Sequence, residues 1–323
     1  MKALVCGISG QDGSYLAELL LRKGYEVVGT SRDAQTANFD NHRRLGIAGR
    51  VQLESMAPHD FRSVLQVLHK TQPDEVYNLS GQSSVGLSFD QPVETLDSVI
   101  TGTLNLLEGI RFLGRPIRFY NAGSSECFGD TGPGGASEGT PFRPRSPYAV
   151  AKAAMFWLVA NYREAYRLHA STGILFNHES PLRPARFVTR KIVAAACRIS
   201  LGSTEKLTLG NLTIRRDWGW APEYVEAMWR MLQRDSADDF VIATGESHSL
   251  QEFVQLVFAR LSLDWRSHTV VSDTLFRPTD ISEGRGIAGK AERMLSWKAQ
   301  AHLAEVINLM VQAELDGLQS LRA

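Results

Sequence analysis

A tyrosine and a lysine stand at the spacing of an acid–base pair. Of the eight tyrosines, only Tyr148 has a lysine four residues later, at Lys152. Residues 147–162 contain no interior proline or glycine, so we expect a helix that places both side chains on one face. A nearby ammonium group lowers the pKa of a tyrosine, which would make the phenolate available as a base near neutral pH. Alone, such a pair is more often a surface contact, so the interpretation depends on what surrounds it.

A second set of polar side chains precedes this helix. Ser124 and Glu126 follow a predicted strand at residues 118–122. In a parallel sheet, ligands bind beyond the carboxyl ends of the strands. Ser124 could therefore bond a substrate hydroxyl, and Glu126 adds an acid–base group that a plain dehydrogenase does not need. By itself the segment could equally be a loop with a helix-capping serine.

Three glycines, Gly7, Gly10 and Gly13, follow the first predicted strand at residues 2–6 and open the first predicted helix. This spacing allows a tight turn and a close approach of a pyrophosphate, whose charge the helix N-terminus stabilises. A simple strand–helix turn is the alternative for glycines alone. The strand before them and the helix after them favour a dinucleotide site.

The second predicted strand, residues 26–30, is followed by Arg32 and Asp33. An arginine there suits the 2′-phosphate of NADP, and an acidic residue suits the ribose of NAD. We expect NADP, with NAD as the alternative.

The first half of the chain alternates short apolar runs with amphipathic segments, which predicts a parallel sheet with helical crossovers. The expected fold is α/β: a Rossmann-type doubly wound parallel sheet with a smaller C-terminal α/β domain that binds substrate. We place the dinucleotide-binding domain, including the Tyr148 helix, at residues 1–176. Residues 177–323 form mainly the substrate domain, with some segments returning to the first. The predicted strands are 2–6, 26–30, 75–79, 118–122, 174–177 and 240–243, and the predicted helices are 15–23, 61–69, 101–112, 147 to beyond 162, 189–201, 223–233, 250–261 and 302–315.

Composition excludes several classes of protein. Basic and acidic residues balance at 35 each, which argues against nucleic-acid binding. No apolar run approaches the ~20 residues that span a bilayer, and the first apolar run is too short for a signal peptide, so we expect a cytoplasmic protein with no membrane partner. Three scattered cysteines form no disulfide framework or zinc site. We expect no metal, because His178 and Glu179 lack a second histidine at the spacing of a zinc protease and Pro181 would break the helix.

These motifs together resemble the extended short-chain dehydrogenase/reductase family, and longer stretches resemble the GDP-mannose 4,6-dehydratases within it. The matching stretches are residues 10–18, 77–79, 146–148, 161–164, 173–181, 187–191, 216–219 and 276–278. They are spread along nearly the whole chain, so the resemblance is carried over residue by residue.

By position, the resemblance implies that Ser124, Glu126 and Tyr148 are catalytic and that Lys152 orients the cofactor and tunes Tyr148. The implied cofactor-binding residues are Gly7, Gly10, Gln11, Asp12, Gly13, Arg32, Leu79, Gly81, Ser83, Lys152, His178 and Arg183. The implied residues for a GDP-sugar are Ser125, Asn177, Val188, Lys191, Arg216, Arg277 and Asp280. Arginine suits a diphosphate because its planar fork matches phosphate oxygens.

The chain departs from the family pattern at several positions. Ser124 stands where threonine is usual, which keeps the hydroxyl, and Asp280 replaces a glutamate. Ala57 and Pro58 replace an Asp-Leu pair that usually contacts adenine, and Arg32 is followed by Asp33 rather than by a second arginine. Both departures leave NAD as an alternative to NADP. Residues 282–289 also differ from the usual Leu-Gly-Asn-Pro-like segment.

The implied reaction converts GDP-mannose to GDP-4-keto-6-deoxymannose without net redox change. Tyr148 takes the proton from O4 while hydride leaves C4, Glu126 removes the C5 proton, water leaves from C6, and hydride returns to C6. A 4-keto-sugar-nucleotide reductase or epimerase on the same scaffold is the nearest alternative, and a non-catalytic dinucleotide sensor is a more distant one. We expect a homodimer or homotetramer.

Overall fold

A seven-stranded sheet positions the motifs. The computed structural model describes residues 1–320, and the strand order is β11-β6-β5-β4-β1-β2-β3, with every neighbouring pair parallel. The strands are β1 (Lys2–Cys6), β2 (Glu26–Ser31), β3 (Gln52–Ser55), β4 (Glu75–Asn78), β5 (Arg118–Ala122), β6 (Ala170–Leu175) and β11 (Phe240–Ile242). From β1 the chain runs outward to β2 and β3, and then returns to β4 on the other side. The crevice between β1 and β4 is therefore the topological switch point, where such sheets bind ligands.

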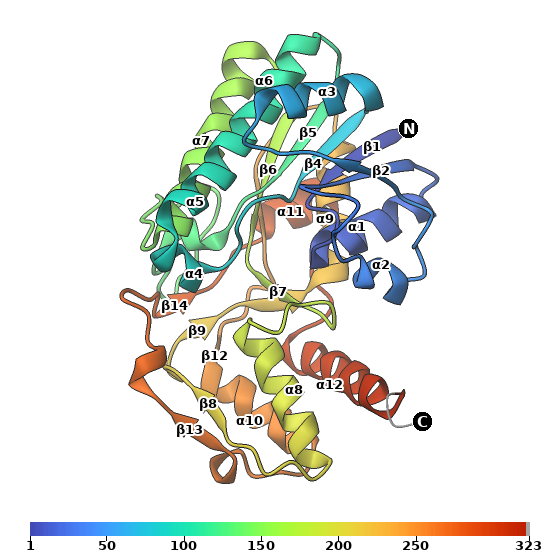
Figure 1. The fold of residues 1–323 in the computed structure, drawn as a ribbon. Helices are drawn as coiled ribbons and strands as arrows, with labels where there is room; N and C mark the ends of the chain where they lie inside the picture. The colour runs from blue at the N-terminus through green and yellow to red at the C-terminus, as the bar shows by residue number, and fades with distance from the viewer. Residues whose placement is uncertain (321–323) are drawn as a thin grey trace.

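Helices cover both faces of this sheet, as the doubly wound prediction requires (Figure 1). Alternate residues of β1 face opposite sides: Ala3 and Val5 pack towards α1 (Gln11–Arg22) and α9 (Ala221–Leu232). Leu4 and Cys6 pack in the other layer. That layer contains α3 (Phe61–Thr71), α6 (Gly102–Leu113) and α7 (Pro147–Tyr166).

A smaller unit follows in the C-terminal part, below the sheet in Figure 1. It is built from α8 (Val188–Ser200), β8 (Leu207–Leu209), α10 (Leu250–Arg260), β13 (Thr269–Val271) and α12 (Leu303–Ser320). Its helices share a separate apolar core, in which Ile192, Phe253 and Met310 are buried. Short strands lie between the two units: β7 (Asn177–Glu179) pairs with β10 (Trp218–Trp220), and β9 (Arg215–Arg216) lies between β12 (His248–Ser249) and β14 (Glu283–Gly284).

Three later segments return to the large sheet. Strand β11 pairs with β6, α9 packs against α1, and α11 (Gly289–Leu295) packs against β11. The division into domains at residues 176 and 177 stays a prediction. The remaining elements are α2 (Asp40–Arg44), α4 (Val85–Asp90), α5 (Pro92–Leu96), η1 (Asp97–Thr101), η2 (Ser125–Phe128), η3 (Trp265–Ser267) and η4 (Asp273–Leu275). None of the helices in residues 1–320 has the length and apolar character to cross a membrane.

Several elements differ from the sequence prediction, and two of them are strands of the large sheet. Strand β3 was not predicted, because Gln52, Glu54 and Ser55 make it polar and it lies at the sheet edge, where only one neighbour is needed. The strand expected at residues 174–177 begins earlier, at Ala170, and ends at Leu175. Asn177 instead begins β7, opposite Trp218 of β10.

Candidate active site

The glycine-rich turn lies at the switch point, between β1 and α1. Gly7 has φ +81°, and a Cβ atom there would lie 2.7 Å from the carbonyl oxygen of Leu79, at the end of β4. A Cβ on Gly13 would lie 2.4 Å from the oxygen of Gly7. The turn, the helix N-terminus and the end of β4 are therefore packed too closely for side chains at these points. The free N–H groups at the start of α1, where Gly10 is the N-cap and Gln11 follows, fit the pyrophosphate of a dinucleotide.

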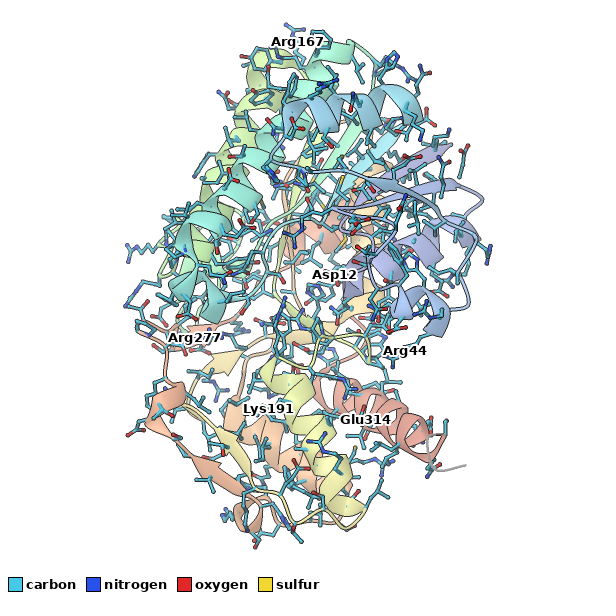
Figure 2. All side chains as sticks on the ribbon, viewed as in Figure 1. Asp12, Arg44, Arg167, Lys191, Arg277 and Glu314 are labelled. Atoms are coloured by element: carbon cyan, nitrogen blue, oxygen red, sulfur yellow. The ribbon has the colours of Figure 1, made fainter. Side chains whose placement is uncertain are left out.

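A buried network ties this turn to β7. The Nε2 atom of His178 lies 2.9 Å from Oδ2 of Asp12, and its Nδ1 atom lies 2.7 Å from the carbonyl oxygen of Phe176. Gln11 donates to the carbonyl oxygen of His178 and accepts from Ser180 at 2.8 Å. Both ring nitrogens of His178 lie beside oxygen acceptors, an arrangement that favours the doubly protonated ring. In Figure 2, Asp12 lies near the middle of the molecule, where the two units meet.

The electrostatics of the pair agree with this protonation. Burial works to lower the pKa of His178, but the carboxylate of Asp12 outweighs it and the pKa is raised. Burial works to raise the pKa of Asp12, and the charge and hydrogen bond of His178 bring it below the ordinary value. The two predicted cofactor residues thus form an ion pair beside the turn.

Arg32 and Asp33 follow β2, as expected. Asp33 accepts backbone N–H groups of Gln35 at 2.9 Å and Thr36 at 3.3 Å. A hydrogen bond from the Thr36 side chain, and then these two backbone bonds, hold the pKa of Asp33 below its ordinary value. The carboxylate is thereby engaged with its own turn. The side chain of Arg32 is exposed beside it.

The remaining predicted cofactor residues lie around the crevice. Leu79 and Gly81 follow β4, and Ser83 accepts a hydrogen bond from Arg186 at 3.4 Å. Arg183 comes from the segment after β7; its Nε lies 3.4 Å from a carboxylate oxygen of Glu179. Segments from both units thus meet across the crevice.

The four predicted catalytic residues come from two segments, η2 with its N-cap and the start of α7. Ser124 is the N-cap of η2, and its hydroxyl accepts the N–H of Glu126 at 3.3 Å. Tyr148 is buried near the start of α7, and Lys152 follows one turn later. The Nζ atom of Lys152 donates to the carbonyl oxygen of Ala122 at 2.8 Å and lies 5.7 Å from the centre of the Tyr148 ring.

The expected lowering of the tyrosine pKa is wrong for this structure. Burial raises the pKa of Tyr148 well above its ordinary value, against the effect of a hydrogen bond with Ser124. Burial also lowers the pKa of Lys152, to about 8. Helical spacing predicted the pair correctly, but it could not show that both groups are enclosed, and desolvation favours the neutral form of each.

Glu126 faces the arginines of the substrate set. Its carboxylate lies 4.0 Å from Nε of Arg216, and Arg216 also donates to Asp280 at 2.9 Å. Arg277 lies 3.4 Å from the same oxygen of Asp280. Burial raises the pKa of Glu126, and Arg216 and then Arg277 work to lower it. A proton acceptor with a raised pKa is thus held beside two cations.

A pocket of about 250 Å³ opens beside Arg277, in the C-terminal unit. Val188 and Asp280 were predicted to bind substrate and do line it. The lining residues that the sequence did not reveal are Gly210, Asn211, Ile214, Leu250, Leu275 and Phe276. They come from three separate segments, and only Phe276, which stands in the matching stretch at residues 276–278, offered a sequence signal.

The other predicted substrate residues lie nearby but are held differently. Ser125 is in η2 and Asn177 begins β7, both partly exposed. Lys191 is in the first turn of α8, and its Nζ donates to the carbonyl oxygen of Thr208 at 2.7 Å, so it does not line the pocket. Figure 2 places Lys191 and Arg277 in the C-terminal unit, on the side of Asp12 away from the large sheet. Residues 1–320 contain no group of three or more histidine, cysteine or acidic side chains able to hold a metal ion.

Known proteins are similar to this chain in sequence and in fold. The family model described as GDP-mannose 4,6 dehydratase matches residues 4–310. GDP-mannose 4,6 dehydratase 1 of Arabidopsis thaliana is 47% identical over 97% of this chain and 90% of its own length. The GDP-mannose 4,6-dehydratase of Sinorhizobium fredii is 42% identical over 99% and 98%. Among solved structures, the UDP-glucose 4-epimerase of Thermus thermophilus in complex with NAD matches with a TM-score of 0.86 and 25% identity, covering 97% of this chain and 99% of its own.

Proposed function

Because the chain belongs to the GDP-mannose 4,6-dehydratase family, we propose that it is a lyase that converts GDP-mannose to GDP-4-keto-6-deoxymannose. The observation that carries the proposal is the position of Glu126. It adds a second acid–base group beside Ser124 and Tyr148, and it faces the arginines that would bind a nucleotide diphosphate. A reductase needs Ser124 and Tyr148 but not this second acid–base group.

The residues around the β1–α1 turn fit a nicotinamide dinucleotide, which several structural neighbours bind. When bound, such a cofactor would supply the acceptor for hydride from C4 of the sugar and the donor of hydride to C6. We expect NADP, because Arg32 is exposed at the end of β2 while Asp33 is engaged with its own turn. NAD is the alternative.

Tyr148 accepts the O4 proton in the first step, and Ser124 holds the reacting hydroxyl. Lys152, whose pKa is about 8, supplies a positive charge and a donor near neutral pH. Because the pKa of Tyr148 is raised, its phenolate is a strong base. The phenolate must therefore be stabilised when cofactor and substrate are bound.

Glu126 acts in the second step, after C4 has become a ketone and the C5 proton is acidic. Its carboxylate accepts the C5 proton, and the resulting acid protonates the C6 hydroxyl, which leaves as water. Hydride return to C6 requires a proton at C5, and the proton that Tyr148 took from O4 balances this last step. The raised pKa of Glu126 suits a group that must take and then give a proton. Arg216 and Arg277 bind the diphosphate, and the pocket beside Arg277 receives the nucleoside. Ser125, Asn177 and Lys191 complete the sugar-nucleotide site.

A second copy of this chain is the proposed partner, as a homodimer or a homotetramer. Trp157 and Val150 lie seven residues apart on α7, with exposed fractions of 63% and 45%. Val93, on the neighbouring helix α5, is 78% exposed. Exposed apolar residues on adjacent helices are typical of an interface. Trp157→Glu should convert the oligomer to monomers in light scattering, and a monomeric wild-type protein would contradict the proposal. The cytoplasmic location stays a prediction.

Incubation with a panel of GDP-, UDP- and dTDP-sugars tests the substrate. We expect GDP-mannose to be consumed and its product to be lighter by one water. Turnover of only UDP- or dTDP-sugars would overturn the substrate assignment. Consumption of reduced cofactor on a 4-keto sugar would favour the reductase, and binding without any turnover would favour a sensor.

A further inference from the structure

Asp217 is a buried carboxylate that the proposed reaction does not use. It stands between β9 and β10, next to Arg216, and its exposed fraction is 0%. Burial raises the pKa of its carboxyl group, and four hydrogen bonds work against that rise. A charge removed from water needs a cation or several donors, and here the partners are donors.

These donors come from two segments that are far apart in the sequence. The Oδ1 atom of Asp217 accepts the N–H and the hydroxyl of Thr244 at 2.9 and 2.7 Å. The Oδ2 atom accepts the N–H groups of Gly245 at 2.9 Å and Gly286 at 3.3 Å. Thr244 and Gly245 follow β11, the edge strand of the large sheet, and Gly286 follows β14. One carboxylate therefore joins the sheet edge to the strand beside β9.

The same segments are fastened to each other around Asp217. The Nε atom of Arg285 donates to the carbonyl oxygen of Gly245 at 2.8 Å. Strand β14 pairs with β9 so that Gly284 lies opposite Arg216. The position of β9, and with it the start of the Arg216 side chain, thus depends on bonds that converge on Asp217.

The guanidinium group of Arg216 is also held in place. Its Nη1 atom donates to the carbonyl oxygen of Ile281 at 2.7 Å, and its Nη2 atom donates to Asp280 at 2.9 Å. Its Nε atom lies 4.0 Å from Glu126. A small shift of β9 would change the distance between Arg216 and Glu126. The other two partners of Arg216, Asp280 and Ile281, precede β14, and the bonds of Asp217 hold β14 in register with β9.

We propose that Asp217 is a positioning residue, which holds β9 so that Arg216 faces Glu126 and the diphosphate of the substrate. The inference rests on the proposed function. It assigns Asp217 an effect on two quantities that general stability does not control: the affinity for the nucleotide sugar and the protonation of Glu126.

The test is Asp217→Asn, which keeps the shape of the side chain but places an amide against N–H donors. We expect the KM for GDP-mannose to rise about tenfold, the lower end of the loss for one charged hydrogen bond. We also expect the acidic limb of the kcat profile to move to higher pH, because a displaced Arg216 no longer works to lower the pKa of Glu126.

Glu75→Gln is the matched control. Glu75 is also a fully buried carboxylate, which accepts hydrogen bonds from Tyr77 and Gln233 away from the catalytic residues. This variant should lose thermal stability but keep the KM and the acidic limb. If Asp217→Asn behaves in the same way, Asp217 is merely structural and the inference is wrong.

Thr244→Val is the second variant, for the case in which Asp217→Asn does not fold. It removes one donor to Asp217 and leaves the backbone donors in place, so both shifts should appear in the same direction and be smaller. If the KM and the acidic limb of the kcat profile are both unchanged, the inference is wrong. If the wild type does not turn over GDP-mannose, the proposed function is wrong, and this outcome is distinct from a failure of the Asp217 inference. The same variants are then compared on the nucleotide sugar that the wild type does turn over.

Discussion

Replacing Glu126 with glutamine should separate oxidation at C4 from elimination across C5 and C6. The side chain keeps its size, and Arg216 keeps its bond to Asp280, so the site should stay folded. Tyr148 and Ser124 are untouched, and oxidation should proceed. The amide can neither accept the C5 proton nor protonate the leaving hydroxyl, so the reaction should stop at the 4-keto sugar.

The expected loss follows from the two proton transfers assigned to this one group. General acid–base catalysis contributes about 10²–10⁴-fold, or about 2.7–5.5 kcal/mol. Because Glu126 serves both transfers, we expect a loss in kcat near the upper end, about 10⁴-fold. Single-turnover absorbance of the reduced nicotinamide should rise on mixing with GDP-mannose and stay high, whereas in the wild type it should rise and fall.

Glu283→Gln is the control for a nearby carboxylate. Glu283 is on β14, 3.8 Å from Nε of Arg215, outside the proposed catalytic set. It should leave the rise and fall of the absorbance intact. Near-wild-type turnover of the Glu126→Gln variant would refute the reasoning and make Glu126 a structural residue.

Four further outcomes are expected. Tyr148→Phe should abolish even the first oxidation, seen as no reduced cofactor in the same experiment; a normal burst would remove Tyr148 from its role. Arg32→Ala should weaken NADP more than NAD in binding titrations, and release of NAD alone from the denatured wild type would contradict the NADP assignment. Arg277→Ala should weaken competitive inhibition by GDP by about 1.5–3 kcal/mol, or roughly 10- to 150-fold; inhibition by UDP instead would contradict the nucleotide assignment. The pKa of His178 is raised in the folded protein, so its pairing with Asp12 stabilises the fold. This stabilisation is complete when the pH is below the unfolded-state pKa of the histidine, and it is lost as the pH rises through the folded-state pKa. The melting temperature gap between wild type and His178→Gln should therefore shrink as pH rises, and a constant gap would show that the pair does not titrate.

Much of the fold could be predicted from local patterns. The strands beside the glycine turn are apolar and short, and the helix that carries Tyr148 and Lys152 has no interior breaker, so spacing alone placed the pair correctly. The polar edge strand β3 lacked such a pattern. The strands between the two units were harder to predict, because β7, β9, β10, β12 and β14 are each two or three residues long and pair with distant segments.

The environment of the site could not be predicted in the same way. The enclosure of Tyr148 and Lys152 comes from packing, and it reversed the expected direction of the tyrosine pKa. Asp217 looked like one more charged residue beside Arg216, because its partners at Thr244, Gly245 and Gly286 lie 27 to 69 residues away in the chain. Residue type predicted which groups could react, and only the fold showed which partners control them.

The transfer of deuterium from C4 to C6 tests the central claim most directly. If one bound cofactor takes hydride from C4 and gives it back at C6, GDP-mannose labelled at C4 should give a product labelled at C6, without net consumption of added NADPH. Mass spectrometry of the product, with NADPH absorbance followed in parallel, measures both. Loss of the label to solvent or free cofactor, or one NADPH consumed for each product formed on a 4-keto sugar, would contradict the account.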